Sequence, residues 1–121
     1  METFVINDQE HELKLTLKSV KYLNGLHDGG AFILLQRVIT GDIDTYVDVV
    51  FAGLMHTGKG FSRKTIEKAI DKAIENEELD LDGINKTMYH VVADSFFYRG
   101  TIEKMFEGDE QAREDLKTLM A

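Results

Sequence analysis

The segment from Ile43 to Met55 constrains the fold more than any other, because its side chains are apolar around most of a helical circumference. The apolar residues are Ile43, Tyr46, Val47, Val49, Val50, Phe51, Leu54 and Met55; a narrow strip of Thr45, Asp48, Ala52 and His56 is polar or small. A helix that is apolar nearly all round is usually buried. We therefore expect a central core helix that is capped by Asp42 or Asp44 and ends at about Thr57.

Helical spacing of apolar residues predicts further helices on both sides of this segment. Before it lie the stripes Leu17, Val20, Leu23 and Leu26, which Asp28-Gly29-Gly30 ends, and Phe32, Leu35, Val38 and Ile39, which Gly41 ends. After it, Ser62 precedes Ile66, Ala69, Ile70, Ala73 and Ile74, and Asp80 or Asp82 precedes Ile84, Met88, Val91, Ser95 and Tyr98. The chain has no proline to interrupt a helix. We predict a mainly α-helical bundle of about five to six helices.

The first residues follow a different period and predict a short β-hairpin. Thr3-Phe4-Val5-Ile6 favours a strand, residues 7–10 are turn formers, and Leu13, Leu15 and Leu17 alternate with polar residues. Such a hairpin is marginal alone, so we expect it to pack on the helices. We take residues 1–106 as a single helical domain that includes the hairpin (1–17). Residues 107–121 are an acidic C-terminal tail, helical or loosely ordered, with a faint stripe of Ala112, Leu116 and Leu119.

Charge and composition exclude several classes of function. The length of 121 residues indicates one domain, and a net charge of −8 argues against binding nucleic acid, which needs clustered Lys and Arg. Cysteine is absent, no apolar run is long enough to cross a membrane, and METFVINDQE lacks the pattern of a signal peptide. We therefore expect a cytoplasmic protein that binds neither nucleic acid nor membrane.

No motif predicts catalysis, a metal site or a cofactor. The stretch GLMHTGKG, residues 53–60, resembles a phosphate-binding loop, but Gly60 replaces the required Ser or Thr and a helix precedes it instead of a strand. We interpret it as a helix end with Gly58 in the left-handed conformation. The histidines His11, His27, His56 and His90 lie in separate elements without metal-ligand spacing. In the acidic run at 75–82, the next glycine comes too early for a calcium loop.

The aromatic run Phe96-Phe97-Tyr98 is the best candidate for a partner-binding surface. If the helix that begins near residue 80 continues regularly, Tyr98 extends its core face, Phe96 lies beside Tyr98 with Tyr89, and Phe97 points the opposite way, toward the polar side with His90. A large aromatic on a polar face marks an interaction surface, although coverage of both faces by the protein's own fold explains it equally well. We predict the partner-binding residues Phe96, Phe97, Tyr98, Tyr89 and His90.

Two stretches resemble the small tail assembly chaperones of long-tailed phages and prophages of Gram-positive bacteria. They are METFVINDQEHELKLTLKSVKYLN and DIDTYVDVVFAGLMHTGKGFSRKTIEKAIDKAIENEELDLDGI, and the resemblance extends over residues 1–106. It implies a mainly helical, non-catalytic protein that binds the tape-measure protein before tube subunits polymerise around it and is absent from the finished virion. It also implies self-association in some members and, in many, a frameshifted longer form that recruits tail-tube subunits. This chain is then the short product.

The residues alone leave other functions open. For a helical chaperone, we expect the client groove between the helix that follows Ser62 and the one that follows Asp80 or Asp82. One alternative is a small helical regulatory or DNA-associated protein of a phage or prophage, for which only residues 59–68 are basic enough. Another is an enzyme or metal protein whose histidines converge in the folded chain.

Overall fold

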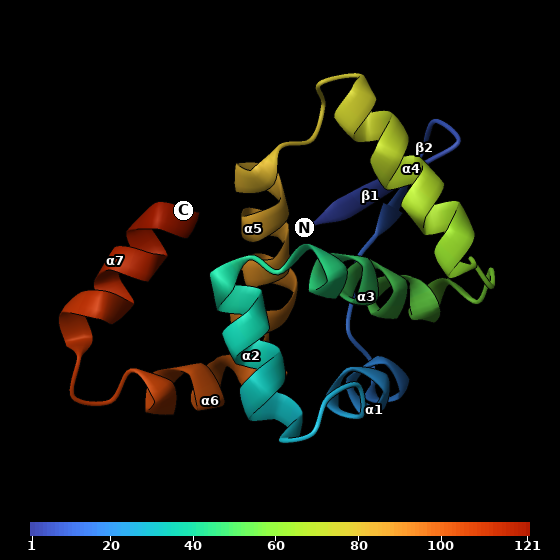
Figure 1. Cartoon of the computed structure of the whole chain (residues 1–121). Helices are drawn as coiled ribbons and strands as arrows, with labels where there is room; N and C mark the ends of the chain where they lie inside the picture. The colour runs from blue at the N-terminus through green and yellow to red at the C-terminus, as the bar shows by residue number, and fades with distance from the viewer.

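The computed structural model describes all 121 residues and consists of seven α-helices and an N-terminal hairpin (Figure 1). The strands are β1 (Thr3–Ile6) and β2 (Gln9–Glu12), and the helices are α1 (Leu17–Asn24), α2 (Gly30–Thr40), α3 (Ile43–Leu54), α4 (Arg63–Glu75), α5 (Leu81–Met88), α6 (Phe96–Met105) and α7 (Glu110–Met120). A 3-10 turn, η1 (Met55–Thr57), extends α3, and a π-helical turn, η2 (Tyr89–Ala93), follows α5. The predicted fold class is confirmed, with more helices than the five to six expected. None of the helices has the combined length and apolar character needed to cross a membrane.

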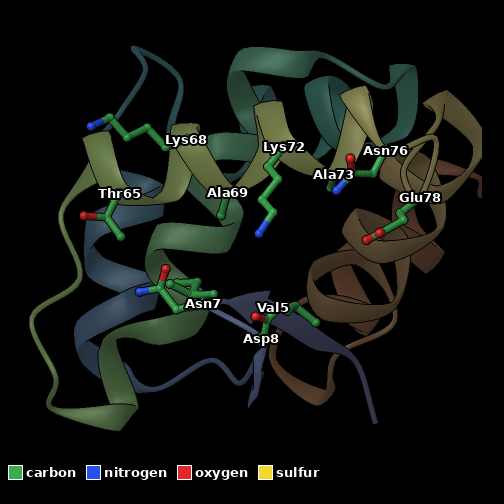
Figure 2. Close-up of a pocket in the computed structure, with 11 residues that line it drawn as sticks. Val5, Asn7, Asp8, Thr65, Lys68, Ala69, Lys72, Ala73, Asn76 and Glu78 are labelled. Atoms are coloured by element: carbon green, nitrogen blue, oxygen red, sulfur yellow. The ribbon is translucent and has the colours of Figure 1, made fainter.

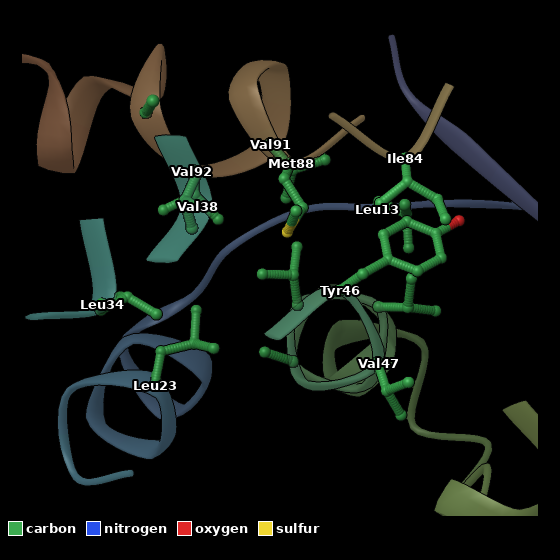
Figure 3. Packing of buried hydrophobic residues seen from close by; sticks show 14 of the residues in the cluster. Leu13, Leu23, Leu34, Val38, Tyr46, Val47, Ile84, Met88, Val91 and Val92 are labelled. Atoms are coloured by element: carbon green, nitrogen blue, oxygen red, sulfur yellow. The ribbon is translucent and has the colours of Figure 1, made fainter. Parts of the chain in front are cut away.

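Helix α3 lies at the centre of the core, as its apolar circumference predicts (Figure 3). Tyr46 and Val50 are almost completely buried, and even Thr45 and Ala52 of the narrow strip are inaccessible. The Thr45 hydroxyl is satisfied because it donates a hydrogen bond of 2.6 Å to the carboxylate of Asp42, the residue that caps α3. Helices α1, α2, α4 and α5, strand β2 and the turn η2 surround α3.

The hairpin turns through Asn7 and Asp8, whose φ angles of 51° and 63° are both in the left-handed region. Two such residues form the tight turn whose twist matches that of the flanking antiparallel strands. Phe4 and Ile6 point from β1 into the core, so the apolar side of the hairpin faces the helices. The expectation that the hairpin packs on the helical bundle is confirmed.

The hairpin ends earlier than the alternating leucines suggest. Thr16 is the N-cap of α1, and its side chain and that of Ser19 each accept a hydrogen bond from the other residue's backbone N–H. This capping box starts the helix at Leu17, which is 69% exposed instead of lying on the apolar face of a strand. Local capping therefore overrides the period-2 pattern at this point.

The long helix expected from Asp80 to Tyr98 is interrupted, which corrects the predicted geometry of its second half. Asp80 caps α5, but the α-helical bonding ends at Met88 and the π turn η2 follows. Ser95 then accepts a hydrogen bond from the backbone N–H of Tyr98 and begins α6 as a new helix. The π turn buries three consecutive residues, Val91, Val92 and Ala93, so this stretch is covered on more than one side.

The C-terminal residues form α7, which turns back from α6 toward α5 and η2 (Figure 1). Its N-cap is Asp109, whose carboxylate accepts a hydrogen bond of 3.1 Å from the Ala112 N–H. Met120, near the end of α7, is buried. The division into a domain at 1–106 and a tail at 107–121 stays a prediction.

Candidate functional site

The structure separates the five predicted partner-binding residues into three environments. Tyr98 belongs to the core: it is 1% exposed, and its hydroxyl donates a hydrogen bond of 2.7 Å to Asn24 Oδ1 at the end of α1. Burial raises the pKa of Tyr98 to about 12. Tyr98 therefore holds α6 against α1, and a partner cannot reach its ring without unfolding this contact.

Phe96 and Phe97 form the exposed part of the site, and we call them the aromatic pair. They occupy the first turn of α6, with 94% and 58% of their surfaces exposed. The expectation that Phe96 lies beside Tyr98 and Tyr89 is wrong, because the π turn and the new cap at Ser95 rotate α6 away from the preceding helix. Phe97 keeps a lateral contact, an edge-to-face packing of its ring on Tyr98 with centroids 5.0 Å apart.

Tyr89 and His90 lie in the π turn beneath the C-terminal helix. The Nε2 atom of His90 is 2.8 Å from the carbonyl oxygen of Met120, and the two rings of Tyr89 and His90 pack edge to face. Tyr89 lines a small cavity of about 60 Å³ together with Leu116 of α7. Burial, followed by the nearby carboxylates of Asp94 and Glu103, raises the pKa of the Tyr89 phenol. Tyr89 is half-buried beneath α7, whereas His90 contacts the end of α7 but is itself exposed.

A groove between α2 and α6 was not predicted from the sequence. Its volume is about 540 Å³, and its lining residues are Ile33, Gln36, Arg37, Ile39, Thr40, Met105 and Phe106. Ile33 and Ile39 flank the stripe of α2 that faces the core; Ile39 belongs to the stripe predicted for this helix, and Ile33 does not. The sequence did contain a signal that these two residues line a surface groove. Leu34, Leu35 and Val38 already complete the buried face of α2, so Ile33 and Ile39 lie beside it.

We expected a groove between the fourth and fifth helices, but the hollow beside the fourth helix has a different second wall. Helix α4 borders a hollow of about 510 Å³, but the other wall is the hairpin, not α5 (Figure 2). Figure 2 shows Lys72 extending from α4 into this hollow and Glu78 approaching from the far side. Ala69 and Ala73, expected to allow close approach of a helix, instead line the hollow opposite β1.

Comparison with protein-family models identifies the family of the chain, and the match covers most of the residues that form this fold. The family model described as phage tail assembly chaperone protein, TAC, matches residues 3–107. The chain belongs to the phage tail assembly chaperone family. No curated protein and no solved structure matches the chaperone at a significant level. The family match ends before Glu110, so α7 lies outside the matched region.

Three of the four histidines of the chaperone contact different parts of the fold. His11 is buried and packs edge to face on Phe61, whereas the Nε2 atom of His56 lies 2.7 Å from the Glu12 carbonyl oxygen. His90 contacts the end of α7 as described above. The structure contains no group of three or more His, Asp or Glu side chains arranged to hold a metal ion.

The stretch that resembles a phosphate-binding loop is a helix end, as predicted. Gly53 lies inside α3, and the 3-10 turn η1 follows the helix directly. Gly58 has a φ angle of 68°, the left-handed conformation that ends many helices. Gly53 has a separate role, because a Cβ atom at this position would lie 3.1 Å from Leu13 Cδ2. The match to the nucleotide motif therefore combines a helix stop and a close approach of the hairpin.

Proposed function

We propose that the chaperone binds the tape-measure protein of its phage during tail morphogenesis and has no catalytic role. One structural observation carries this proposal besides family membership: Phe96 and Phe97 are adjacent and 94% and 58% exposed. Aromatic side chains contribute strongly to binding when a partner buries them. Left exposed, they promote aggregation. The aromatic pair is therefore the anchor that we assign to the client.

The groove between α2 and α6 lies farther along the helix on the side of Phe97, not of Phe96. Phe97, Thr101 and Met105 are spaced by four residues, so they follow one another along the same side of α6. Met105 follows Phe97 by eight positions, which corresponds to about 12 Å of helix. Met105 in turn lines the groove with Ile33 and Ile39 of α2. This surface suits an amphipathic client helix with two or more turns of apolar stripe.

The charge of the chaperone supports the same proposal. A net charge of −8 keeps a complex with an apolar client soluble and disfavours binding to DNA. We propose that the complex forms in the cytoplasm of a bacterial host, Gram-positive by the sequence resemblance, and that the chaperone is absent from the finished virion. The long, helical tape-measure protein has the kind of surface that such an acidic partner protects.

Co-expression with the tape-measure protein of the same phage tests this function. The measurement is the amount of tape-measure protein that stays soluble and co-purifies with the tagged chaperone. We expect the double substitution Phe96→Ser and Phe97→Ser to lower the recovered client by about tenfold, which corresponds to about 1.4 kcal/mol of binding free energy. Both side chains are exposed, so the variant is expected to fold as the wild type does.

The matched control is Leu81→Ser at the start of α5, because Leu81 is 57% exposed, much like Phe97, but lies on another helix. We expect this control to recover as much client as the wild type. Equal recovery by the control and by the double phenylalanine variant would exclude the aromatic pair as the anchor. If the wild-type chaperone itself recovers no tape-measure protein, the proposed client is wrong.

We also propose that the chain is the shorter of two products, and that a frameshifted longer form recruits tail-tube subunits. Expression of the intact phage locus followed by mass spectrometry of the chaperone checks this: a second product with a C-terminal extension is expected. We further propose that the chain self-associates, as the family resemblance implies for some members, and light scattering of the purified chain checks this. A single product and a monomer at all concentrations would contradict these two statements.

A further inference from the structure

Helix α7 is docked on α6 and η2, but none of its own side chains belongs to the main core cluster. Met120 is 4% exposed, yet it is not part of the contiguous core cluster that contains the other buried apolar side chains. Its carbonyl oxygen lies 2.8 Å from His90 Nε2. Farther back along α7, the Arg113 guanidinium forms an ion pair with Glu103 of α6. A satellite cluster of this kind can open without disturbing α3 and its neighbours.

The docking of α7 is incomplete. A cavity of about 60 Å³ remains between α7 and the surface beneath it, lined by Tyr89, Ile102 and Leu116. The Nε atom of Arg113 is buried without a hydrogen-bond partner, and Leu119 is 64% exposed. A helix of this length is barely stable in water on its own, so α7 is ordered by contacts that are few and imperfect. Opening of α7 is therefore expected to be frequent and reversible.

We propose that the surface beneath α7 is a second helix-binding site for the client, occupied in the free chaperone by α7 itself. We call this surface the α7 bed and define it by Tyr89, His90, Ala93, Ile102 and Glu103. The identity of the client rests on the proposed function, whereas the existence of the site rests on α7 being seated there. A client helix displaces α7 and takes its place.

The contacts of α7 define the chemistry of the helix that fits. Ala112, Leu116 and Met120 are spaced by four residues and form one apolar stripe. Arg113, directly after the first of them, pairs with Glu103. The bed therefore selects an amphipathic helix with an apolar stripe of at least two turns and a basic residue beside its first apolar position.

A client helix can gain a contact that α7 does not make. Phe96 precedes Glu103 by seven residues, so both lie on the same side of α6, where Phe96 is left 94% exposed by α7. A client with a larger apolar face covers Phe96 as well as the bed. Because α7 competes for the bed in the same chain, the client binds only while the bed is open. The apparent Kd for the client is the intrinsic Kd divided by the open fraction, so it is about tenfold weaker if the bed is open one-tenth of the time.

The test uses the full chain with α7 released by substitution. Met120→Asp places a charge at the buried position, and Arg113→Glu breaks the pair with Glu103 without changing a buried apolar side chain. Leu119→Asp is the matched control, because it makes the same chemical change as Met120→Asp at an exposed position of the same helix. Amide hydrogen exchange establishes that α7 is released and that α3 stays protected in each variant.

The probe is a fluorescent synthetic peptide of residues 108–121, titrated by anisotropy. We expect it to bind the two releasing variants about tenfold more tightly than the wild type or Leu119→Asp. In the Met120→Asp chain, Glu103→Arg abolishes this binding, and a peptide that carries Arg113→Glu restores it. If hydrogen exchange shows α7 released and the peptide binds no more tightly, the α7 bed is not a helix-binding site and the inference is overturned.

A second titration assigns the client and separates this inference from the proposed function. At limiting chaperone, Met120→Asp is expected to recover more tape-measure protein than Leu119→Asp, and excess peptide is expected to displace it. Equal recovery without displacement overturns the assignment of the bed to the client while the proposed function stands. The wild type could also be a dimer that Met120→Asp converts to a monomer. That result would assign the bed to a second copy of the chain and would likewise overturn its assignment to the client. The peptide titration contains no client, so it decides on the site even if the proposed client is wrong.

Discussion

Replacing Gly53 with alanine is expected to destabilise the chaperone, although the same change stabilises most helices. Alanine in a helix interior is favoured over glycine by about 0.5–1 kcal/mol. At Gly53, however, the new Cβ would lie 3.1 Å from Leu13 Cδ2 and 3.2 Å from Leu13 Cβ. The hairpin cannot move away freely, because the N–H of Lys14 donates a hydrogen bond of 3.0 Å to the Gly53 carbonyl oxygen.

The expected magnitude follows from the difference between the two effects. Overpacking of a tight contact typically costs about 1–3 kcal/mol, so we expect Gly53→Ala to lose about 1 kcal/mol of unfolding free energy after the gain in helix propensity. Gly100→Ala in α6 is the matched control, because a Cβ there meets no atom within 4 Å. This control is expected to gain about 0.5–1 kcal/mol.

Urea unfolding followed by far-ultraviolet circular dichroism measures both free energies. We expect the midpoint of Gly53→Ala to fall and that of Gly100→Ala to rise, with unchanged slopes, because neither substitution alters the surface exposed on unfolding. In thermal unfolding, each 1 kcal/mol corresponds to roughly 3–5 °C for a chain of this size. If Gly53→Ala is as stable as Gly100→Ala, the hairpin yields easily, and the reasoning from the close approach is refuted.

Three further predictions concern polar groups that join distant elements. Asp48→Asn is expected to cost about 1 kcal/mol in urea unfolding, because the Asp48 carboxylate, 13% exposed, loses its ion pair with Arg63 of α4; no change would mean that solvent screens the pair fully. Tyr98→Phe is expected to cost about 1 kcal/mol by the same assay, since it removes the hydrogen bond to Asn24, whereas an unchanged midpoint would mean that water replaces the hydroxyl. Burial holds the pKa values of Tyr46 and Tyr98 at about 12, compared with 10.0 in the unfolded chain. Above pH 10 the folded state therefore retains protons that the unfolded state has lost, so stability falls as pH rises from 10 toward 12. Urea midpoints across this range check the slope, and Tyr46→Phe is expected to make it shallower.

Local sequence chemistry predicted the elements that depend on nearby residues. Ser62 caps α4 as expected, and Asp42 and Asp80, each one of two predicted candidates, cap α3 and α5, because a capping side chain needs only the backbone N–H groups of the next turn. Gly41 and Gly58 end their helices in the left-handed conformation for the same local reason. The central position of α3 was also predictable, because a helix with apolar side chains all round has no face to present to water.

The candidate site was predicted only in part, because exposure depends on elements far apart in the sequence. The sequence singled out Phe96 and Phe97 by their composition, and both are exposed. It placed Tyr98 on the core face of its helix but still counted it among the partner-binding residues, and the contact that holds Tyr98, a hydrogen bond to Asn24, 74 residues earlier, could not be predicted. The role of His90 depends on where the chain's own C-terminal helix docks, which the faint stripe in that helix did not specify.

The sequence by itself determined that this protein is a small helical bundle with a terminal hairpin, where most helices begin and end, and which family it belongs to. Only the tertiary structure decided that a π turn replaces a continuous helix before Ser95, and which side of α6 is covered by α7 and which by α2. The physical reason is the range of the interactions. Caps, turns and apolar periods act within about one or two helical turns, whereas a functional surface is what remains after distant elements have packed.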